Sequence, residues 1–228
     1  MHAVITGANR GIGLEFVRQL LARGDTVIAA VRDPKRADEL KQLASRASGR
    51  LAIHACDVGS DASVSAFAKA IGDQPIDLVV NNAGVYGRDR QEVGDMDFED
   101  ALHTYNVNAL GPVRVAFAVR PKLARNAKVV SVTSGMGSIA DNRSGGYYGY
   151  RMSKAALNMA AKSLAVDLRS EGIAAAVINP GWVHTDMGGA GAPTAVDDSV
   201  RGMLKQIDAL TVSNTGTFLN WRGGEYPW

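Results

Sequence analysis

The fold of this chain is decided by its opening stretch, His2-Ala3-Val4-Ile5-Thr6-Gly7-Ala8-Asn9-Arg10-Gly11-Ile12-Gly13. Its first residues form a short apolar run that predicts a strand. A glycine turn follows, and then a helix pattern with Ile12, Phe16, Leu20 and Leu21 on one side. Glycines let the backbone approach a pyrophosphate closely, and a helix N-terminus offers free N–H groups and a positive dipole end. The stretch therefore predicts a phosphate cradle, although its Gly-x-x-x-Gly-x-Gly spacing also suits a plain tight turn.

Apolar runs and helical patterns alternate along the rest of the chain. Five further strand-like runs lie at 26–31, 51–56, 76–80, 127–133 and 173–178. This alternation predicts an α/β fold, with residues 1–228 forming a single domain around a doubly wound parallel sheet in three αβα layers. Ligands of such sheets bind at the carboxyl ends of the strands. We therefore expect one sheet edge to collect the polar and glycine-rich segments that follow the strands, at 7–13, 81–84, 134 and 180–185.

The composition argues against several classes of partner. The chain has 228 residues and a net charge of +2, with acids and bases spread along it, so we expect no nucleic-acid or membrane partner. Its one cysteine, Cys56, allows no internal disulfide and fits a reducing compartment. No apolar run approaches the roughly 18 residues of a membrane helix, and the early strand leaves no room for a signal peptide. We expect a cytoplasmic protein.

The end of the second strand bears on the choice of nicotinamide cofactor. In a dinucleotide fold this position meets the adenosine ribose, where an acid would bind the hydroxyls of NAD. Here Val31 takes that place, Arg32 follows, and Arg10 lies in the glycine turn on the same side. Two guanidinium groups suit a 2′-phosphate, so NADP(H) is favoured over NAD(H). Asp33 is close enough to leave NAD open, and both arginines also suit a solvated surface.

The segment 106–112 conflicts with the helical pattern around it. It reads Asn-Val-Asn-Ala-Leu-Gly-Pro, and asparagine, glycine and proline inside a helix cost stability. Such a conflict indicates a kink or a functional site. Residues 85–97 and 186–199 are expected to be loops, and residues 35–47 and 200–210 helices.

Tyr150 and Lys154 lie one turn apart on one face of a helix that is expected to begin near Tyr147. A tyrosine is a poor acid or base at neutral pH because its ordinary pKa is about 10. A nearby ammonium group favours the phenolate and lowers that pKa, so the pair could move a proton at an alcohol or carbonyl oxygen. Tyr147 and Arg151 have the same spacing, so spacing alone does not choose between the pairs.

Taken together, the motifs resemble the short-chain dehydrogenases/reductases over essentially the whole chain. The matching residues, in family order, are Thr6-Gly7-x-x-x-Gly11-x-Gly13, Asn81-Asn82-Ala83-Gly84, Asn108, Ser134, Tyr150-x-x-x-Lys154 and Pro180-Gly181-x-x-x-Thr185. The chain is more closely similar to the carbonyl-reductase branch, which includes the C-factor and sniffer proteins. That closer match rests on Gly135-x-Gly137-Ser138-Ile139-x-Asp141-Asn142 and on Gly224-Glu225-x-Pro227-Trp228.

The resemblance implies a Rossmann fold and hydride transfer between a nicotinamide and a small carbonyl or alcohol substrate. It implies that Tyr150 is the acid/base and that Lys154 lowers its pKa and binds the nicotinamide ribose. Ser134 would bond the substrate oxygen, Asn108 would hold a water that relays protons to Lys154, and Thr185 would position the carboxamide. The implied cofactor-binding residues are Gly7, Asn9, Arg10, Gly11, Ile12, Gly13, Arg32, Asp57, Val58, Asn82, Ala83, Gly84, Tyr150, Lys154, Pro180, Gly181, Val183 and Thr185. No metal is expected.

Several alternatives stay open at this point. Ser138 is the rival of Ser134, which we favour because it follows the strand directly. The C-terminal aromatic residues could cap the substrate or pack in the core or an interface, and we favour packing. A homodimer or homotetramer is plausible because the helix after Tyr147 has an alanine-rich face. The second functional hypothesis is a dinucleotide-binding signalling or sensor protein with little catalysis, as C-factor-like relatives suggest.

Overall fold

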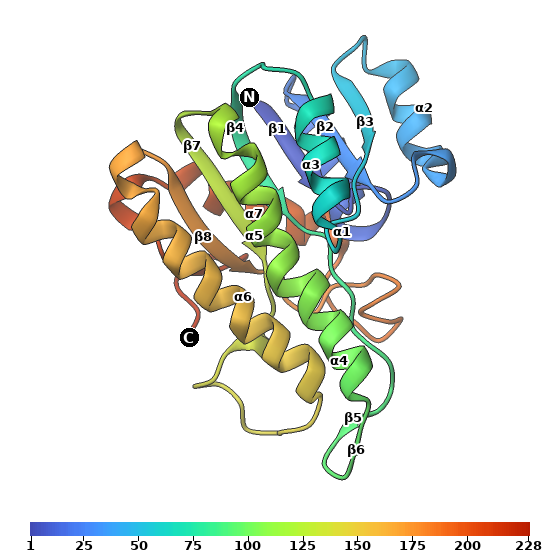
Figure 1. The fold of residues 1–228 in the computed structure, drawn as a ribbon, viewed down its shortest axis with the longest axis vertical. Coiled ribbons are helices and arrows are strands. Elements are labelled where there is room, and N and C mark those ends of the chain that lie inside the picture. The colour runs from blue at the N-terminus through green and yellow to red at the C-terminus, as the bar shows by residue number, and fades with distance from the viewer.

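A seven-stranded sheet runs through the centre of the protein in the computed structural model, which describes residues 1–228 (Figure 1). Neighbouring strands are parallel, in the spatial order β3-β2-β1-β4-β7-β8-β9. Chain order reverses direction between β1 and β4, and ligands of doubly wound sheets bind at such a switch point. The strands are β1 (His2–Thr6), β2 (Thr26–Val31), β3 (Leu51–Ala55), β4 (Ile76–Asn81), β7 (Leu123–Val132), β8 (Ala174–Asn179) and β9 (Phe218–Asn220).

The central strands are covered on both faces. Every residue of β1 and of β8 is buried, as expected for parallel strands between two layers of helices. Successive side chains point to opposite faces, so Ile5 lies in one hydrophobic core and Val4 in the other. The strand registers pair Thr6 with Ala30 and Asn81 with Ser131, which brings the carboxyl ends of these strands to one edge.

Two groups of helices cover the two faces of the sheet. One core lies between the sheet and α1 (Gly11–Ala22), α2 (Asp38–Arg46) and α7 (Val196–Ala209). The other core lies between the sheet and α3 (Asp61–Ala70), α5 (Gly111–Val119) and α6 (Tyr148–Asp167). Figure 1 shows α3, α5 and α6 in front of the sheet and α7 behind it. This arrangement confirms the predicted three-layer α/β fold with a doubly wound parallel sheet.

The expected irregularity around Pro112 is present. Helix α4 (Phe98–Tyr105) passes into a π-helical turn over Asn106–Leu110, and α5 then begins at Gly111. Proline has no N–H to donate to the preceding turn, so it fits best where the hydrogen-bond pattern changes. Turns with π geometry are often found at functional sites. Here the turn carries Asn108.

Two segments expected to be loops contain regular structure. The 85–97 segment includes a hairpin of β5 (Gln91–Glu92) and β6 (Asp95–Met96). Helix α7 begins at Val196, inside the segment expected to be a loop, because Asp197 and Asp198 complement its N-terminal dipole. The helix expected over 35–47 is divided into a 3₁₀ turn and α2. The 3₁₀ turns are η1 (Pro34–Arg36), η3 (Arg120–Lys122), η4 (Gly135–Gly137), η5 (Arg169–Glu171) and η6 (Val212–Asn214).

None of the helices combines the length and the apolar character needed to cross a membrane. The cytoplasmic location stays a prediction. Cys56 follows β3 and is buried, and this burial raises the pKa of its thiol to about 11. A buried thiol with a raised pKa is expected to be inert and not reactive.

Candidate active site

The ends of β1 and β4 are locked together at the carboxyl edge of the sheet. The buried Thr6 hydroxyl accepts hydrogen bonds from the backbone N–H groups of Asn82 and Ala83, both at 3.0 Å. The Asn82 side-chain amide donates in return to the carbonyl oxygens of Thr6 at 3.0 Å and Gly7 at 3.2 Å. These bonds fix the glycine turn beside the Asn82 segment.

The glycine turn has room for backbone only. Gly7 has a φ of +63°, and a Cβ built on it would lie 2.8 Å from the Ala83 Cα. A Cβ at Gly13 would overlap the Gly7 carbonyl oxygen. Helix α1 begins at Gly11, and the Arg10 side chain does not cap it. An uncapped first turn, partly accessible at Gly11 and Ile12 and approached by bare backbone, fits the pyrophosphate of a dinucleotide.

Tyr150, Lys154 and Ser134 meet at the same edge. Tyr150 lies in the first turn of α6, and the Ser134 side chain is close enough to its hydroxyl to influence the pKa of the phenol. The Lys154 Nζ lies 5.8 Å from the centroid of the tyrosine ring and donates to the Val132 carbonyl oxygen at 3.0 Å. Both side chains are buried, with 7% of Tyr150 and 5% of Lys154 exposed. The carboxyl end of β7 thus holds the amine beside the phenol.

Burial dominates the protonation of both groups. Desolvation raises the pKa of Tyr150 to about 12, while the Ser134 side chain acts to lower it. Desolvation also lowers the pKa of Lys154 to about 8. The expectation that the amine brings the tyrosine pKa below its ordinary value is therefore wrong for this structure. The physical reason is that a buried pair disfavours the charged form of each partner.

Ser138 has a different environment from Ser134. Its hydroxyl donates to the Trp228 carbonyl oxygen at 3.1 Å and accepts from the Asp141 N–H at 3.0 Å. Tyr226 bonds the Asp141 carboxylate at 2.6 Å, and the rings of Tyr226 and Trp228 both pack against Phe218. Ser138 and these aromatic rings therefore hold the C-terminal segment against the residues that follow β7.

Asn108 ties the segment after β4 to helix α6. Its side chain accepts from the Val85 N–H and donates to the Val85 carbonyl oxygen, both at 2.8 Å. It also donates to the Ser153 hydroxyl at 3.0 Å. A Cβ at Gly84 would lie 3.2 Å from the Asn108 oxygen and 3.7 Å from the Lys154 Nζ. The role of Asn108 in holding a water stays a prediction.

The two arginines predicted to bind the 2′-phosphate of NADP(H) are both exposed. Arg10 pairs with Asp186 at 3.1 Å, and Arg32 forms neither an ion pair nor a side-chain hydrogen bond in the structure. The Asp33 carboxylate accepts from the Lys35 N–H at 2.9 Å and so caps the turn that follows. Asp33 is therefore already engaged, while the Arg32 guanidinium has no partner of its own.

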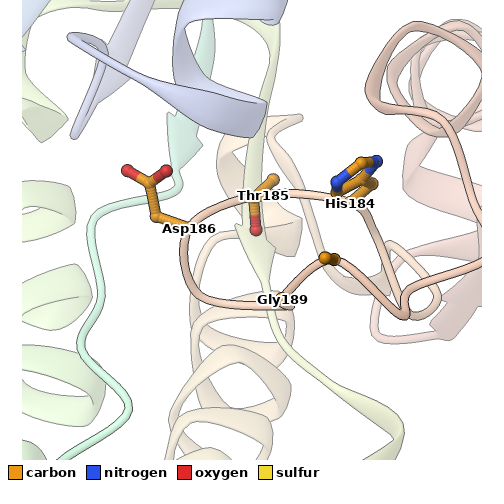
Figure 2. A pocket seen from close by; sticks show the side chains of 5 residues that line it. His184, Thr185, Asp186 and Gly189 are labelled. Atoms are coloured by element: carbon orange, nitrogen blue, oxygen red, sulfur yellow. The ribbon is translucent and has the colours of Figure 1, made fainter.

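A cavity of about 430 Å³ lies in the bend after β8. It is lined by His184, Thr185, Asp186, Gly189 and Ala190, and Figure 2 shows the Thr185 hydroxyl directed into this bend. A Cβ at Gly11 would lie 3.4 Å from the Thr185 methyl group, so the cavity adjoins the glycine turn. Thr185 fixes the bend by accepting from the Gly188 N–H at 3.0 Å.

The remaining predicted cofactor residues also follow the carboxyl ends of strands. Asn9 and Ile12 lie in the glycine turn and at the start of α1. Asp57 and Val58 follow β3, where the Asp57 carboxylate accepts from the Gly59 N–H at 2.9 Å. Pro180, Gly181 and Val183 follow β8: Val183 is buried, and the Pro180 carbonyl accepts from the Ser199 hydroxyl at 2.7 Å.

Sequence reasoning missed two residues that contact Tyr150. The ring of Tyr86 lies 4.6 Å from that of Tyr150, measured between centroids. The Gln91 side-chain oxygen accepts from the Tyr150 N–H at 2.8 Å. Tyr86 follows the Asn81–Gly84 motif by two positions, which could have drawn attention to it. Gln91 stands in a polar stretch without periodicity, and no sequence signal marks it.

Comparison with known proteins relates the whole chain to one family. The family described as short chain dehydrogenase matches residues 1–195. The C-signal protein of Myxococcus xanthus is 50% identical over 165 residues, which cover 72% of this chain and 99% of that protein. The 1-hydroxy-2-glutathionyl-2-methyl-3-butene dehydrogenase of Rhodococcus sp. (strain AD45) is 36% identical over 232 residues, covering 99% of this chain and 98% of that protein.

Solved structures with the same fold include carbonyl reductases. The carbonyl reductase Sniffer of D. melanogaster superposes with a TM-score of 0.94 at 32% identity, covering 100% of this chain and 99% of that one. The NADPH-bound carbonyl reductase from chicken fatty liver gives a TM-score of 0.93 at 37% identity, covering 100% and 98%. With the fold, the motifs and these relatives in agreement, the chain belongs to the short-chain dehydrogenase family and is an oxidoreductase.

Proposed function

We propose that the protein is an NADP(H)-dependent carbonyl reductase or alcohol dehydrogenase in which Tyr150 is the acid/base. The observation that carries this proposal is the burial of Tyr150 at the carboxyl edge of the sheet, with the Lys154 Nζ 5.8 Å from its ring centroid and the Ser134 side chain near its hydroxyl. This cluster stands at the same sheet edge as the glycine cradle. When bound there, the nicotinamide would supply or accept the hydride.

The proton chemistry follows from the environment of the phenol. With its pKa raised to about 12, Tyr150 stays protonated at neutral pH and can donate to a substrate carbonyl oxygen as negative charge develops there. The Ser134 hydroxyl can bond the same oxygen and hold it next to the phenol. The Lys154 ammonium then stabilises the phenolate that remains. In alcohol oxidation the same groups act in reverse: Tyr150 must first lose its proton before it can take the hydroxyl proton, so a raised pKa favours this direction at high pH.

Cofactor preference is proposed from Arg32 and Arg10. Arg32 is exposed at the end of β2 without an ion-pair partner, and the nearby Asp33 carboxylate caps a turn. A guanidinium group at this position suits the 2′-phosphate of NADP(H). The chicken carbonyl reductase is NADPH-bound, which supports the same choice here. The residues of the glycine turn and those after β3, β4 and β8 complete the proposed cofactor site.

The decisive experiment is a screen of aldehydes and ketones with NADPH and NADH, run on the wild type and on Tyr150→Phe. We expect NADPH oxidation with the wild type and a loss of roughly 10²- to 10⁴-fold in kcat with the variant, because the proton donor is gone. NADPH affinity, measured by fluorescence titration, should change little. Undiminished turnover in Tyr150→Phe would remove Tyr150 from the chemistry.

A second candidate is a dinucleotide-binding signalling protein with little catalysis. The 50% identity with the C-signal protein is the observation that favours it. A protein that only binds the dinucleotide has no need of Ser134, Tyr150 and Lys154 gathered at one edge of the sheet, so we rank this candidate second. The same screen separates the two functions, since measurable NADPH binding without oxidation by any carbonyl compound would favour signalling.

Self-association is proposed as a further property. Helix α6 exposes Met152, Met159 and Val166 at seven-residue intervals, and the neighbouring α4 exposes Phe98 and Leu102. Exposed apolar side chains repeated along one helix and its neighbour suit an interface between identical subunits. A homodimer or homotetramer is therefore the expected state in solution, and sedimentation velocity would show it.

A further inference from the structure

We propose that Gln91 is a positioning residue for Tyr150, an inference that rests on the proposed role of Tyr150 as acid/base. Gln91 belongs to the β5–β6 hairpin, 59 positions before Tyr150 in the chain. Only 4% of it is exposed. Its side chain forms no hydrogen bond with the glycine cradle or with Ser134, so its influence on the reaction would pass through the tyrosine.

Helix α6 needs a cap from elsewhere because its own N-terminus provides none. Its N-cap residue, Tyr147, is left-handed with a φ of +52° and makes no side-chain cap. The first backbone N–H groups of a helix have no partner within it, and a buried one is costly to leave unpaired. The hairpin provides the missing acceptors: the Gln91 oxygen takes the Tyr150 N–H at 2.8 Å, and the Glu92 carboxylate takes the Tyr147 N–H at 3.3 Å.

The nitrogen of the Gln91 amide fixes the backbone around Tyr86, the second aromatic residue of the site. This nitrogen donates to the carbonyl oxygens of Tyr86 at 3.0 Å and Arg88 at 2.9 Å. The Tyr86 ring packs on the Tyr150 ring at 4.6 Å between centroids. One side chain therefore bonds the backbone of both residues in this aromatic contact.

Two glycines leave the space that this amide occupies. A Cβ at Gly149 would lie 3.2 Å from the Gln91 oxygen. A Cβ at Gly87 would lie 3.1 Å from the Gln91 nitrogen and 2.9 Å from the Asp100 carboxylate, and Gly87 has a φ of +86°. With one accepted and two donated hydrogen bonds, an amide matches its surroundings, whereas a carboxylate would face two carbonyl oxygens.

The first test replaces the amide by an apolar side chain of similar size in Gln91→Leu. We expect kcat to fall roughly ten- to a hundredfold, because a small displacement of a reacting group has effects of this size. The Kd for NADPH should stay within about twofold, since the glycine cradle keeps its own bonds. Loss of kcat without loss of cofactor affinity is a result that general destabilisation does not give.

The second test is Gln91→Glu, measured as the ratio of its kcat to that of wild type across pH. Burial and the two facing carbonyl oxygens raise the pKa of the introduced carboxyl. The neighbouring carboxylates of Glu92 and Asp100 raise it further, whereas the positive charges of Arg88 and Arg151 lower it. When protonated, the carboxyl donates to one carbonyl and accepts from the Tyr150 N–H. The ratio should therefore rise as pH falls, and this comparison is internal to one folded variant.

Asn214→Leu is the control for the hydrogen-bond pattern, at an exposed amide. That amide also accepts a backbone N–H, from Thr211, and donates to a backbone carbonyl, of Ala209. It lies near the start of β8, at the opposite edge of the sheet. The kcat of Asn214→Leu should equal that of wild type.

The outcomes separate this proposal from the proposed function. Wild-type kcat in both Gln91 variants, with Tyr150→Phe inactive, overturns the positioning role and leaves the acid/base assignment standing. A parallel fall of kcat and NADPH affinity in Gln91→Leu, with a pH-independent ratio in Gln91→Glu, makes Gln91 merely structural. An active Tyr150→Phe overturns both proposals.

Discussion

The glycine cradle and the tyrosine cluster share one sheet edge but are built in opposite ways. The cradle is made of backbone, from a stretch of seven residues that starts at Gly7 and is closed by Thr6 and Asn82. The tyrosine cluster is made of side chains from segments far apart in the chain, which include Tyr86, Gln91 and Ser134. We therefore expect the cradle to lose stability and cofactor binding when a substitution adds a side-chain atom. We expect the tyrosine cluster to lose activity when a substitution removes one.

Adding a single carbon to the cradle should produce the largest effect. In Gly13→Ala the new Cβ would overlap the Gly7 carbonyl oxygen and approach the Asn82 amide, neither of which can move without breaking the bonds between β1 and β4. We expect a loss of about 3 kcal/mol or more in unfolding free energy, the upper end for overpacking. NADPH binding should be lost with it, as chemical denaturation and fluorescence titration would show.

The control for this prediction is Gly24→Ala, at a surface glycine whose Cβ would meet nothing within 4 Å. Its left-handed φ of +87° makes it a test of backbone strain without any clash. It should lower stability modestly and leave NADPH affinity intact. A Gly13→Ala protein with wild-type stability and affinity would show that the cradle tolerates extra volume.

Removing one oxygen from the tyrosine cluster should produce the next largest effect. Ser134→Ala deletes the hydroxyl beside the Tyr150 phenol, and we expect kcat to fall roughly 10²- to 10³-fold, the usual result of losing one donor to a developing oxyanion. The pKa of Tyr150 should rise further, because the hydroxyl that lowers it is gone. NADPH affinity should change little, and stability should fall by about 1 kcal/mol, because the Ser134 side chain also accepts from the Met136 N–H at 3.1 Å.

Ser138→Ala is the paired control, because the two serines differ in what they bond. Its hydroxyl holds Trp228 and Asp141, so its loss should cost about 1 kcal/mol of stability and leave kcat near wild type. If Ser138→Ala lost turnover and Ser134→Ala kept it, the assignment of the serine would have to be exchanged.

The same contrast explains how much the sequence could predict. The α/β fold, the glycine turn and the strand-end segments follow from periodicity and local motifs, because buried parallel strands and tight turns leave contiguous signals. The irregularity at Asn106–Leu110 was also predictable from its conflict with helical propensity. The β5–β6 hairpin and Gln91 were not, since their stability comes from tertiary contacts with α6 that no local pattern encodes. The pKa of Tyr150 was wrongly predicted because spacing shows the neighbouring amine but not the burial.

The smallest effect is expected from Arg32, an exposed side chain at the rim of the cradle. Arg32→Ala should lower the NADPH-to-NADH ratio of kcat/KM about tenfold, which corresponds to about 1.4 kcal/mol, because an exposed guanidinium is partly screened by solvent. Arg46→Ala, an exposed arginine at the end of α2, is the control and should leave the ratio unchanged. Arg10 should contribute less than Arg32, since part of its charge is already offset by Asp186 at 3.1 Å. An unchanged ratio in Arg32→Ala would mean that cofactor choice does not depend on this guanidinium.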